Sequence, residues 1–276
     1  MVWFIGLSAE STVNVLNSNR PATPLLTFED LQLRCDKSDP NVTNNEPWNW
    51  GISPGQRIAV ITQNAFVRYQ LIGVLADLIQ PVSGQISTNG VVGWPVGGEG
   101  GLDSKLRVSH GVEFLSILYG DCLSRSKVSE NDFWSLLNGQ EISSGMLIKE
   151  LSKSQKDFFF LSLSVLFSFD LYLISRTKYL MSKAARPLRE LLQLQLEGKT
   201  LLSTSPSNKF RREFCTSGLV LGPLGEVLFQ GELEESIQWA DANLGAVEVS
   251  ESDEESFSLE GDFKNSDAID GQADMI

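Results

Sequence analysis

Apolar positions along the chain alternate between short runs that suit buried strands and longer stretches with helical spacing. Residues 57–61, 171–174 and 200–203 are short runs, and the first of them follows a Ser-Pro-Gly turn. Residues 66–78 place apolar side chains three or four positions apart, which predicts a helix. Strands that alternate with helices in this way favour an α/β fold, with a three-layer sheet of parallel strands.

Further elements follow from the same patterns. In chain order, we expect short strands at 85–87 and 91–93 around the Asn89-Gly90 turn, a helical region over 107–137, a helix over 187–196, a hairpin over 219–229 and a helix over 233–243.

The most apolar stretch, residues 158–174, needs a membrane test. It is short of the roughly 20 apolar residues that a spanning helix requires, and three serines and Asp170 interrupt it. We therefore predict a buried helix followed by a buried strand, not a membrane span.

Charge is distributed unevenly. The chain has 22 Lys and Arg residues against 35 Asp and Glu residues, a net charge of −13. Residues 247–276 hold ten of these acids and one basic residue, Lys264, so they contribute −9 and leave −4 for residues 1–246. Few bulky residues accompany this charge, which predicts a disordered acidic tail. Because acidity repels a phosphate backbone, nucleic acid is not an expected partner.

Few residues are suited to redox, metal or acid–base chemistry. Cys35, Cys122 and Cys215 are far apart and lack metal-ligand spacing, which indicates a reducing compartment and no disulfide framework. His110 is the sole histidine, and we expect it to serve a loop or a helix start rather than catalysis. No signal peptide and no metal site are predicted.

Four stretches resemble the nucleotide-binding subunit of an ABC transporter, in the branch that exports capsular polysaccharide or O-antigen. The similarity covers about residues 31–243. The stretch at residues 93–102, with residues 118–120, is the most specific, because its Trp-Pro and glycine-rich character is typical of the polysaccharide exporters. The four are Ile-Ser-Pro-Gly-Gln at 52–56, residues 75–86, Gly-Trp-Pro-Val-Gly-Gly-Glu-Gly-Gly-Leu at 93–102 with Leu-Tyr-Gly at 118–120, and Leu-Leu-Ser-Thr-Ser-Pro at 201–206.

The resemblance implies a P-loop NTPase-like three-layer core with a small N-terminal antiparallel β region and a helical subdomain at about 102–155. Residues 1–246 would form the ABC ATPase-like domain, followed by the tail at 247–276. It also implies a membrane permease as partner, and either a homodimer or a heterodimer with a competent ATPase subunit. The expected location is cytoplasmic, peripheral on the inner face of the plasma membrane.

The phosphate loop of the family is altered. A loop of the form GxxxxGK[ST] uses glycines so that backbone amides can surround the phosphates. Here residues 62–70 read Thr-Gln-Asn-Ala-Phe-Val-Arg-Tyr-Gln, without glycine. Non-glycine residues in left-handed geometry cost about 1–2 kcal/mol each. One interpretation is an ordinary strand-to-helix turn with a solvated Arg68; the other keeps weak nucleotide contacts, because a guanidinium suits phosphate. The candidates are Asn64, Arg68, Tyr69 and Gln70.

The remaining motifs of the family are altered in the same direction. Ser175 and Arg176 stand where Asp and Glu would hold Mg²⁺ and polarise water, and Thr204 stands at the switch histidine. The signature motif reads Leu-Ser-Lys-Ser-Gln, so Ser152 and Gln155 are kept. They could contact the γ-phosphate of a partner subunit, or Ser152 could simply cap a helix.

Together these changes predict that the chain does not hydrolyse ATP and has no catalytic residue. We expect a degenerate subunit or regulator, a pseudoenzyme that accompanies a polysaccharide exporter. The resemblance implies ATP as the cofactor, whereas the altered motifs argue against ATP binding. No metal is expected if ATP does not bind. Two alternatives stay open: a weakly hydrolysing transporter ATPase that uses Arg68, and a stand-alone scaffold or regulator of glycan assembly.

Overall fold

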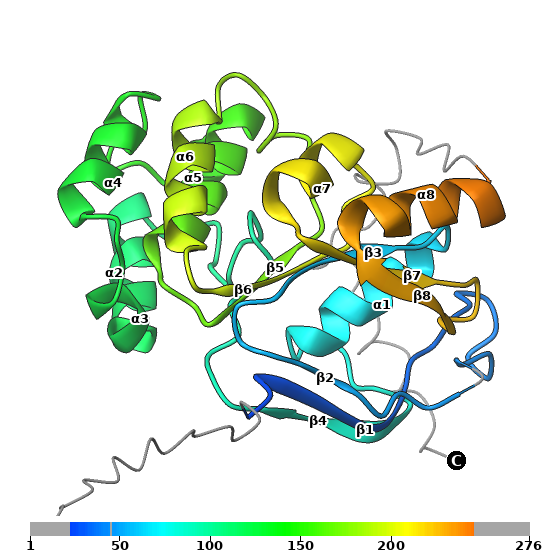
Figure 1. Cartoon of the computed structure of the whole chain (residues 1–276). Coiled ribbons are helices and arrows are strands. Elements are labelled where there is room, and N and C mark those ends of the chain that lie inside the picture. Colours follow the sequence, from blue (N-terminus) through cyan, green and yellow to red (C-terminus); the bar gives the residue numbers. More distant parts are fainter. Residues whose placement is uncertain (1–22, 45, 246–276) are drawn as a thin grey trace, which may run out of the picture.

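Two β-sheets with helices packed against them form the computed structural model, which describes residues 23–44 and 46–245 (Figure 1). The smaller sheet is antiparallel, in the order β2-β1-β4, and the larger has the order β5-β6-β3-β7-β8. The strands are β1 (Leu26–Gln32), β2 (Gly51–Ile52), β3 (Arg57–Ile61), β4 (Ser83–Thr88), β5 (Leu171–Ile174), β6 (Thr200–Ser203), β7 (Ser217–Leu221) and β8 (Val227–Glu232).

The helices cover both faces of the larger sheet. Figure 1 shows α1 between the two sheets, and α2, α3 and α4 grouped at one end of the molecule beyond α5 and α6. The helices are α1 (Ala65–Leu75), α2 (Val108–Leu118), α3 (Gly120–Ser124), α4 (Glu130–Asn138), the 3-10 turn η1 (Ile148–Glu150), α5 (Lys153–Leu166), α6 (Arg186–Gln195), α7 (Asn208–Phe214) and α8 (Leu233–Asn243).

The central strand β3 shows how the sequence produces layers. Ile58 and Val60 belong to the core that contains α1 and the small sheet, whereas Ala59 and Ile61 belong to the core that contains α5, α6 and α8. Successive side chains of a strand point to opposite faces, so an uninterrupted apolar run suits a strand that is covered on both sides. β3 pairs in parallel with β6 and β7. The predicted three-layer α/β fold, with its antiparallel β region, is confirmed.

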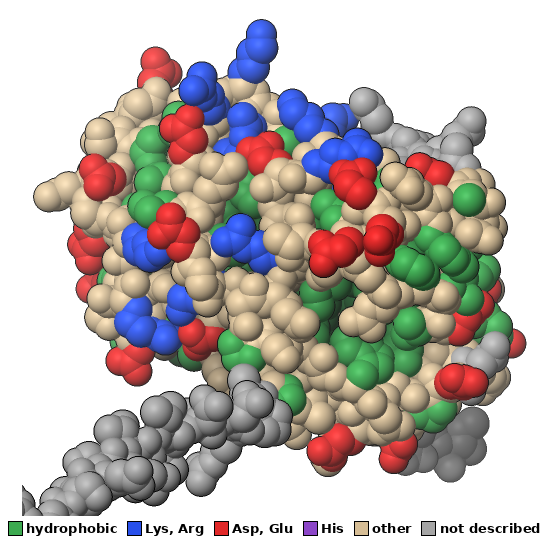
Figure 2. Space-filling view, viewed as in Figure 1, with side chains coloured by type: hydrophobic (Ala, Val, Ile, Leu, Met, Phe, Trp, Pro, Cys, Tyr) green, Lys and Arg blue, Asp and Glu red, His purple; other side chains and the backbone are tan. Residues whose placement is uncertain are grey.

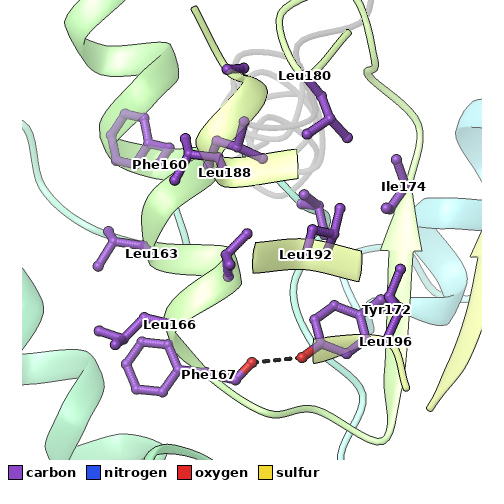
Figure 3. Packing of buried hydrophobic residues seen from close by; sticks show 14 of the residues in the cluster. Phe160, Leu163, Leu166, Phe167, Tyr172, Ile174, Leu180, Leu188, Leu192 and Leu196 are labelled. Atoms are coloured by element: carbon purple, nitrogen blue, oxygen red, sulfur yellow. Dashed lines mark hydrogen bonds between the residues drawn. The ribbon is translucent and has the colours of Figure 1, made fainter. Parts of the chain in front are cut away.

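The longest apolar run folds as a buried helix, α5, followed by a buried strand, β5, as predicted. Figure 3 shows α6 packed against both, with Leu188, Leu192 and Leu196 spaced by one helical turn. The Tyr172 hydroxyl in β5 donates to the Phe167 carbonyl at 2.8 Å, which satisfies a polar atom inside this core. Among the described residues, no helix is both long and apolar enough to cross a membrane.

Two details differ from the sequence prediction. The helix expected over 66–78 ends at Leu75, because Asp77 takes a left-handed conformation with φ of 55°. The strands expected around the Asn89-Gly90 turn do not pair with each other. β4 pairs with β1, and Val92 instead bridges Leu171 in parallel, because Asn89 bonds back to the chain entering β1.

The other predicted elements are confirmed, with α8, β5 and β6 matching their expected bounds. Helix α7 was not predicted; its seven residues are too short for a clear periodic pattern. The helical region contains α2, α3 and α4, while the division into subdomains stays a prediction. The acidic tail lies outside the described residues.

Candidate nucleotide site and docking surface

Asn64 organises the turn that joins β3 to α1. Its side-chain oxygen accepts from the backbone amides of Phe66 at 2.9 Å and Val67 at 3.2 Å, which makes it the N-cap of α1. Its side-chain nitrogen donates to the carbonyls of Cys35 at 2.8 Å and Pro223 at 2.7 Å. One amide side chain therefore starts the helix and ties it to two distant loops.

These contacts use the amides that a phosphate loop would offer to its ligand. The helix begins at Ala65, directly inside the altered motif, and the Arg68 amide donates to the Asn64 carbonyl at 3.2 Å. Residues 62–70 contain no positive φ; in the described chain such angles occur outside glycine at Asp30, Asp77 and Glu141. The segment is thus an ordinary strand-to-helix turn in its backbone geometry, the first of the two interpretations.

Arg68 folds back on this turn instead of standing in solvent. Its side chain is buried, and Nη1 donates to the Thr62 carbonyl at 3.2 Å. Gln70 is also buried, while the Tyr69 ring stacks on Phe66 with centroids 6.2 Å apart. The structure therefore gathers Asn64, Arg68, Tyr69 and Gln70 at the start of α1, and each of the four takes part in the protein's own packing or hydrogen bonds.

A second buried arginine lies near Arg68. Arg211 donates to the Ser205 carbonyl at 2.9 Å and to Asn208 Oδ1 at 2.8 Å. Burial, and after it the positive charge of Arg68, lower the pKa of Arg211 to about 10. The region between the ends of β3 and β6 therefore carries the positive charge of two buried arginines.

The ends of β5 and β6 carry no carboxylate where catalysis would need one. Ser175 and Arg176 follow β5, and the Thr204 amide after β6 donates to the Ile174 carbonyl at 3.0 Å. The Thr204 hydroxyl is buried without a hydrogen-bond partner. Within residues 23–44 and 46–245, no group of three His, Cys, Asp or Glu side chains could hold a metal ion.

The two surviving signature residues act on their own helix. Ser152 Oγ accepts from the Gln155 amide at 3.3 Å, and Gln155 Oε1 accepts from the Ser152 amide at 3.0 Å. This reciprocal pair is a capping box at the start of α5. Gln155 also donates to the Gln140 carbonyl at 3.1 Å, so its amide group links α5 to the helical region.

A cavity of about 560 Å³ lies beside the start of α5 and the residues that follow β5. The turn at residues 62–70 contributes none of its lining. Sequence reasoning identified the glycine-rich segment but not the cavity, because five separate segments form it. They are residues 76 and 78, residues 92–101, Tyr119, the start of α5 with Lys153, Lys156, Asp157 and Phe160, and the pair Ser175 and Arg176.

Aromatic packing shapes one side of this cavity. Trp94 contacts Tyr119 and Phe169 with ring centroids 5.3 and 5.0 Å apart. Gly100 has φ of 61°, and a Cβ there would lie 3.3 Å from the Trp94 ring. The glycines of this loop therefore let the backbone turn closely over the tryptophan.

Helix α2 presents an apolar face next to the cavity. Phe114, Ile117 and Leu118 are 50%, 78% and 60% exposed, while other apolar residues of the helix are buried. Tyr119 follows Leu118 directly and lines the cavity. We call Phe114, Ile117 and Leu118 the α2 patch. A helix that is apolar on its outer face as well as its inner one is a surface available to a partner.

The curated relatives and the solved structures that this chain resembles are ATP-binding proteins of transport systems. A scan against protein-family models finds no match. The polysialic acid transport ATP-binding protein KpsT of Escherichia coli is 28% identical over 185 residues, which cover 66% of this chain and 83% of the relative. A second KpsT protein of Escherichia coli is 27% identical over 175 residues, 62% of this chain and 76% of that one.

Solved structures agree on the fold. The ATP-binding subunit of an ABC transporter superposes with a TM-score of 0.58 at 20% identity, over 87% of this chain and 99% of that one. A nucleotide-free ATP-binding cassette gives 0.54 at 13% identity, over 83% and 100%. The chain is thus similar in sequence to the KpsT ATP-binding proteins and in fold to ABC transporter ATP-binding subunits.

The turn after β3 departs from the ABC phosphate-loop motif in its residues and in the partners of its amides. In that motif glycines expose amides, and a lysine and a hydroxyl follow them. This chain has Val67, Arg68 and Tyr69 at the last three of these positions, and Asn64 already occupies the first amides of α1. The ABC fold is present here with a differently built phosphate end.

Proposed function

We propose that this chain is a non-hydrolysing ABC-type subunit or regulator that associates with a polysaccharide exporter at the cytoplasmic face of the membrane. The observation that carries the proposal is the β3–α1 turn, whose amides are bonded to Asn64. A phosphate cradle works by offering such amides to the ligand. In this proposal the ABC-type fold is kept, and the groups that bind and hydrolyse nucleotide are replaced.

The absence of hydrolysis is supported by the groups at the strand ends. Phosphoryl transfer needs metal ions that neutralise developing charge and a residue that orients the attacking water. Ser175 can supply at most a hydroxyl, and Arg176 is a cation that cannot act as the base. The uncharged hydroxyl of Thr204 cannot replace a titrating imidazole.

The association with an exporter is supported by two features. The relatives found by sequence are named for polysialic acid transport. The α2 patch leaves three large apolar side chains in water, and covering them would release roughly 25 cal/mol for each Å² removed from water. We expect the partner at the α2 patch to be a membrane permease subunit, and a second ABC subunit to complete the transporter.

The direct test co-expresses the full chain with the polysaccharide permease of its own organism and the competent ATP-binding subunit of that exporter. We expect the chain to co-migrate with the detergent-solubilised permease. Ile117→Glu with Leu118→Glu should lower the recovered fraction at least tenfold, the effect of about 1.4 kcal/mol. Val227→Glu with Leu228→Glu is the matched control, because these β8 side chains are 44% and 38% exposed and lie elsewhere.

Other outcomes would decide between the alternatives. Recovery with soluble glycan-assembly enzymes and no permease would favour a stand-alone regulator. Equal loss in the α2 and β8 variants would mean that the α2 patch is not the docking surface. Steady ATP turnover by the chain alone would contradict the non-hydrolysing role and favour a weak transporter ATPase.

A further inference from the structure

The cavity lining brings charges of both signs together. Glu99 and Asp157 contribute carboxylates, while Lys153, Lys156 and Arg176 contribute cations, so the bases outnumber the acids by one. Glu99, Lys153 and Asp157 also make interactions within the chain, so the polar part of the lining is a network of charges. A ligand in this cavity therefore meets hydrogen-bond donors and acceptors side by side.

Aromatic rings and backbone form the rest of the lining. Trp94 and Tyr119 are half-buried, and Phe160 lies beside them in the lining. A Cβ added at Gly97 or Gly101 would have no heavy atom within 4 Å, so the glycine-rich segment presents its backbone to open space. The volume of about 560 Å³ is within the roughly 300–1,000 Å³ of small-molecule sites.

This mixture of groups favours one class of ligand over others. A lipid tail would cover the charged side chains without offering them hydrogen bonds. A ligand with several phosphates would bring concentrated negative charge against the two carboxylates. A saccharide suits both parts of the lining. Each of its hydroxyl groups donates and accepts, and the C–H groups of its rings can pack on aromatic faces, which carry partial negative charge.

The segment that continues from the cavity is basic. Residues 176–186 contain Arg176, Lys178, Lys183 and Arg186 and no acidic residue. The segment begins in the cavity lining and ends at the start of α6. Figure 2 shows Lys and Arg side chains gathered along the upper edge of the molecule, above α6 and α7. Because the whole chain carries a net charge of −13, this local excess of bases favours a ligand with repeated negative charge.

We propose that the cavity binds the end of an acidic saccharide chain. Its sugar rings pack against Trp94 and Tyr119, its hydroxyl groups bond to the acids of the lining, and its carboxylates lie against Lys156 and Arg176. The following sugar units extend along residues 176–186. The inference goes beyond the proposed function, because the saccharide needs neither a permease nor a second subunit to bind.

Isothermal titration calorimetry of the purified full chain tests this directly. The probes are trimers of galacturonic acid and of mannuronic acid, each beside the neutral trimer of the same linkage, galactotriose or mannotriose. We expect at least one acidic trimer to bind at least tenfold more tightly than its neutral counterpart. Raising the ionic strength from about 0.1 to about 1 M shortens the Debye length from about 10 to about 3 Å, so the acidic trimer should lose affinity and the neutral one should not.

A pair of substitutions tests the cations of the lining. Lys156→Gln with Arg176→Gln should weaken binding of the acidic trimer at least tenfold and that of the neutral trimer less. Neither side chain forms an ion pair within the part of the chain that the structure describes, so these changes break no such pair. Lys105→Gln with Lys149→Gln is the matched control, because both lysines are exposed and lie outside the lining, and it should leave the affinity unchanged.

Hydrogen exchange of the wild-type chain locates the ligand without any substitution. The acidic trimer should slow exchange at least threefold at residues 94–101 and at the start of α5, and leave α8 unchanged. Protection confined to other surfaces would exclude this cavity.

Several calorimetric results would overturn the proposal. These are no binding of either acidic trimer at millimolar concentration, or equal affinity for each acidic trimer and its neutral counterpart. Acetate that binds as tightly as the acidic trimer would mean that the cavity holds a simple anion. Undiminished affinity in the Lys156 and Arg176 variant would show that these cations do not hold the carboxylates. None of these results bears on permease docking, which the α2 patch tests separately.

Discussion

Single residues decide what the end of β3 can do. Asn64 accepts from two helix amides and donates to two distant carbonyls. The two amides therefore already have the hydrogen-bond acceptor that a phosphate would otherwise supply. The sequence already contained the signal, because asparagine directly before an apolar helix is a favoured N-cap. What could not be predicted was the second pair of bonds, since Cys35 and Pro223 are remote in sequence.

We expect Asn64→Ala to lower the free energy of unfolding by about 2 kcal/mol, because it removes the cap and leaves two carbonyls without their donor. Asn64→Ser is the matched control, because a serine hydroxyl keeps a capping oxygen without placing a negative charge against the Cys35 and Pro223 carbonyls, so its loss should be smaller. Urea unfolding of the three proteins measures this. Indistinguishable midpoints for the alanine variant and wild type would contradict the assigned role.

Asp170 gives the fold a pH dependence. Burial raises its pKa, but the Val91 amide at 3.0 Å and the charges of Lys199 and Arg125 outweigh that effect, and the net pKa lies below its ordinary value. A lowered carboxyl pKa stabilises the fold above the unfolded value of about 3.9, and this contribution is lost as pH falls through the folded pKa.

Asp170→Asn should therefore lower the free energy of unfolding by about 1 kcal/mol at neutral pH. The gap between variant and wild type should begin to narrow below about pH 4, where the carboxyl of the unfolded chain takes up its proton, and should close as pH falls through the lower pKa of folded Asp170. Chemical unfolding at a series of pH values measures the gap. A constant difference down to about pH 2.5 would mean that the Asp170 charge is not responsible.

At the scale of elements, close approach between a strand and a helix controls the packing of α8. A Cβ added at Gly218 in β7 would lie 2.3 Å from the Ser236 Cβ in α8. The Ser236 hydroxyl donates to the Glu232 carbonyl at 2.9 Å, so it has little freedom to move away. Glycine is thus required at position 218 because a side chain there would collide with Ser236, and not because the backbone is left-handed.

Gly218→Ala should lower the free energy of unfolding by about 1–3 kcal/mol through overpacking. Adding Ser236→Gly in the same chain should recover part of that loss, although it also weakens α8 slightly. A double-mutant cycle by urea unfolding isolates the coupling. Additive effects of the two substitutions would contradict the predicted contact.

Elements differed in how well the sequence predicted them. β5 and β6 are covered on both faces, so their apolar runs mark their bounds directly. β1 pairs with β4, more than fifty residues further on, and its half-exposed Leu-Thr-Phe-Glu-Asp-Leu-Gln pattern carries little periodic signal. The cavity and the α2 patch depend on which segments meet in three dimensions, so local pattern could not predict either.

At the scale of the whole molecule, an ABC-type fold carries a phosphate end that is closed by its own side chains. Asn64 accepts from the first helix amides, Arg68 donates to the Thr62 carbonyl of its own turn, and Ser175, Arg176 and Thr204 follow β5 and β6. The cavity and the α2 patch remain open to partners. The fold thus combines an exposed apolar helix face and a cavity with a β3–α1 turn whose first amides bond within the chain.

Thermal unfolding of the purified full chain with millimolar Mg-ATP, read together with phosphate release, tests the central claim most directly. A ligand at 100 times its Kd would stabilise the fold by about 2.7 kcal/mol. We predict no shift of the unfolding midpoint and no phosphate release above buffer. A saturable shift accompanied by phosphate release that Arg68→Ala abolishes would contradict the account.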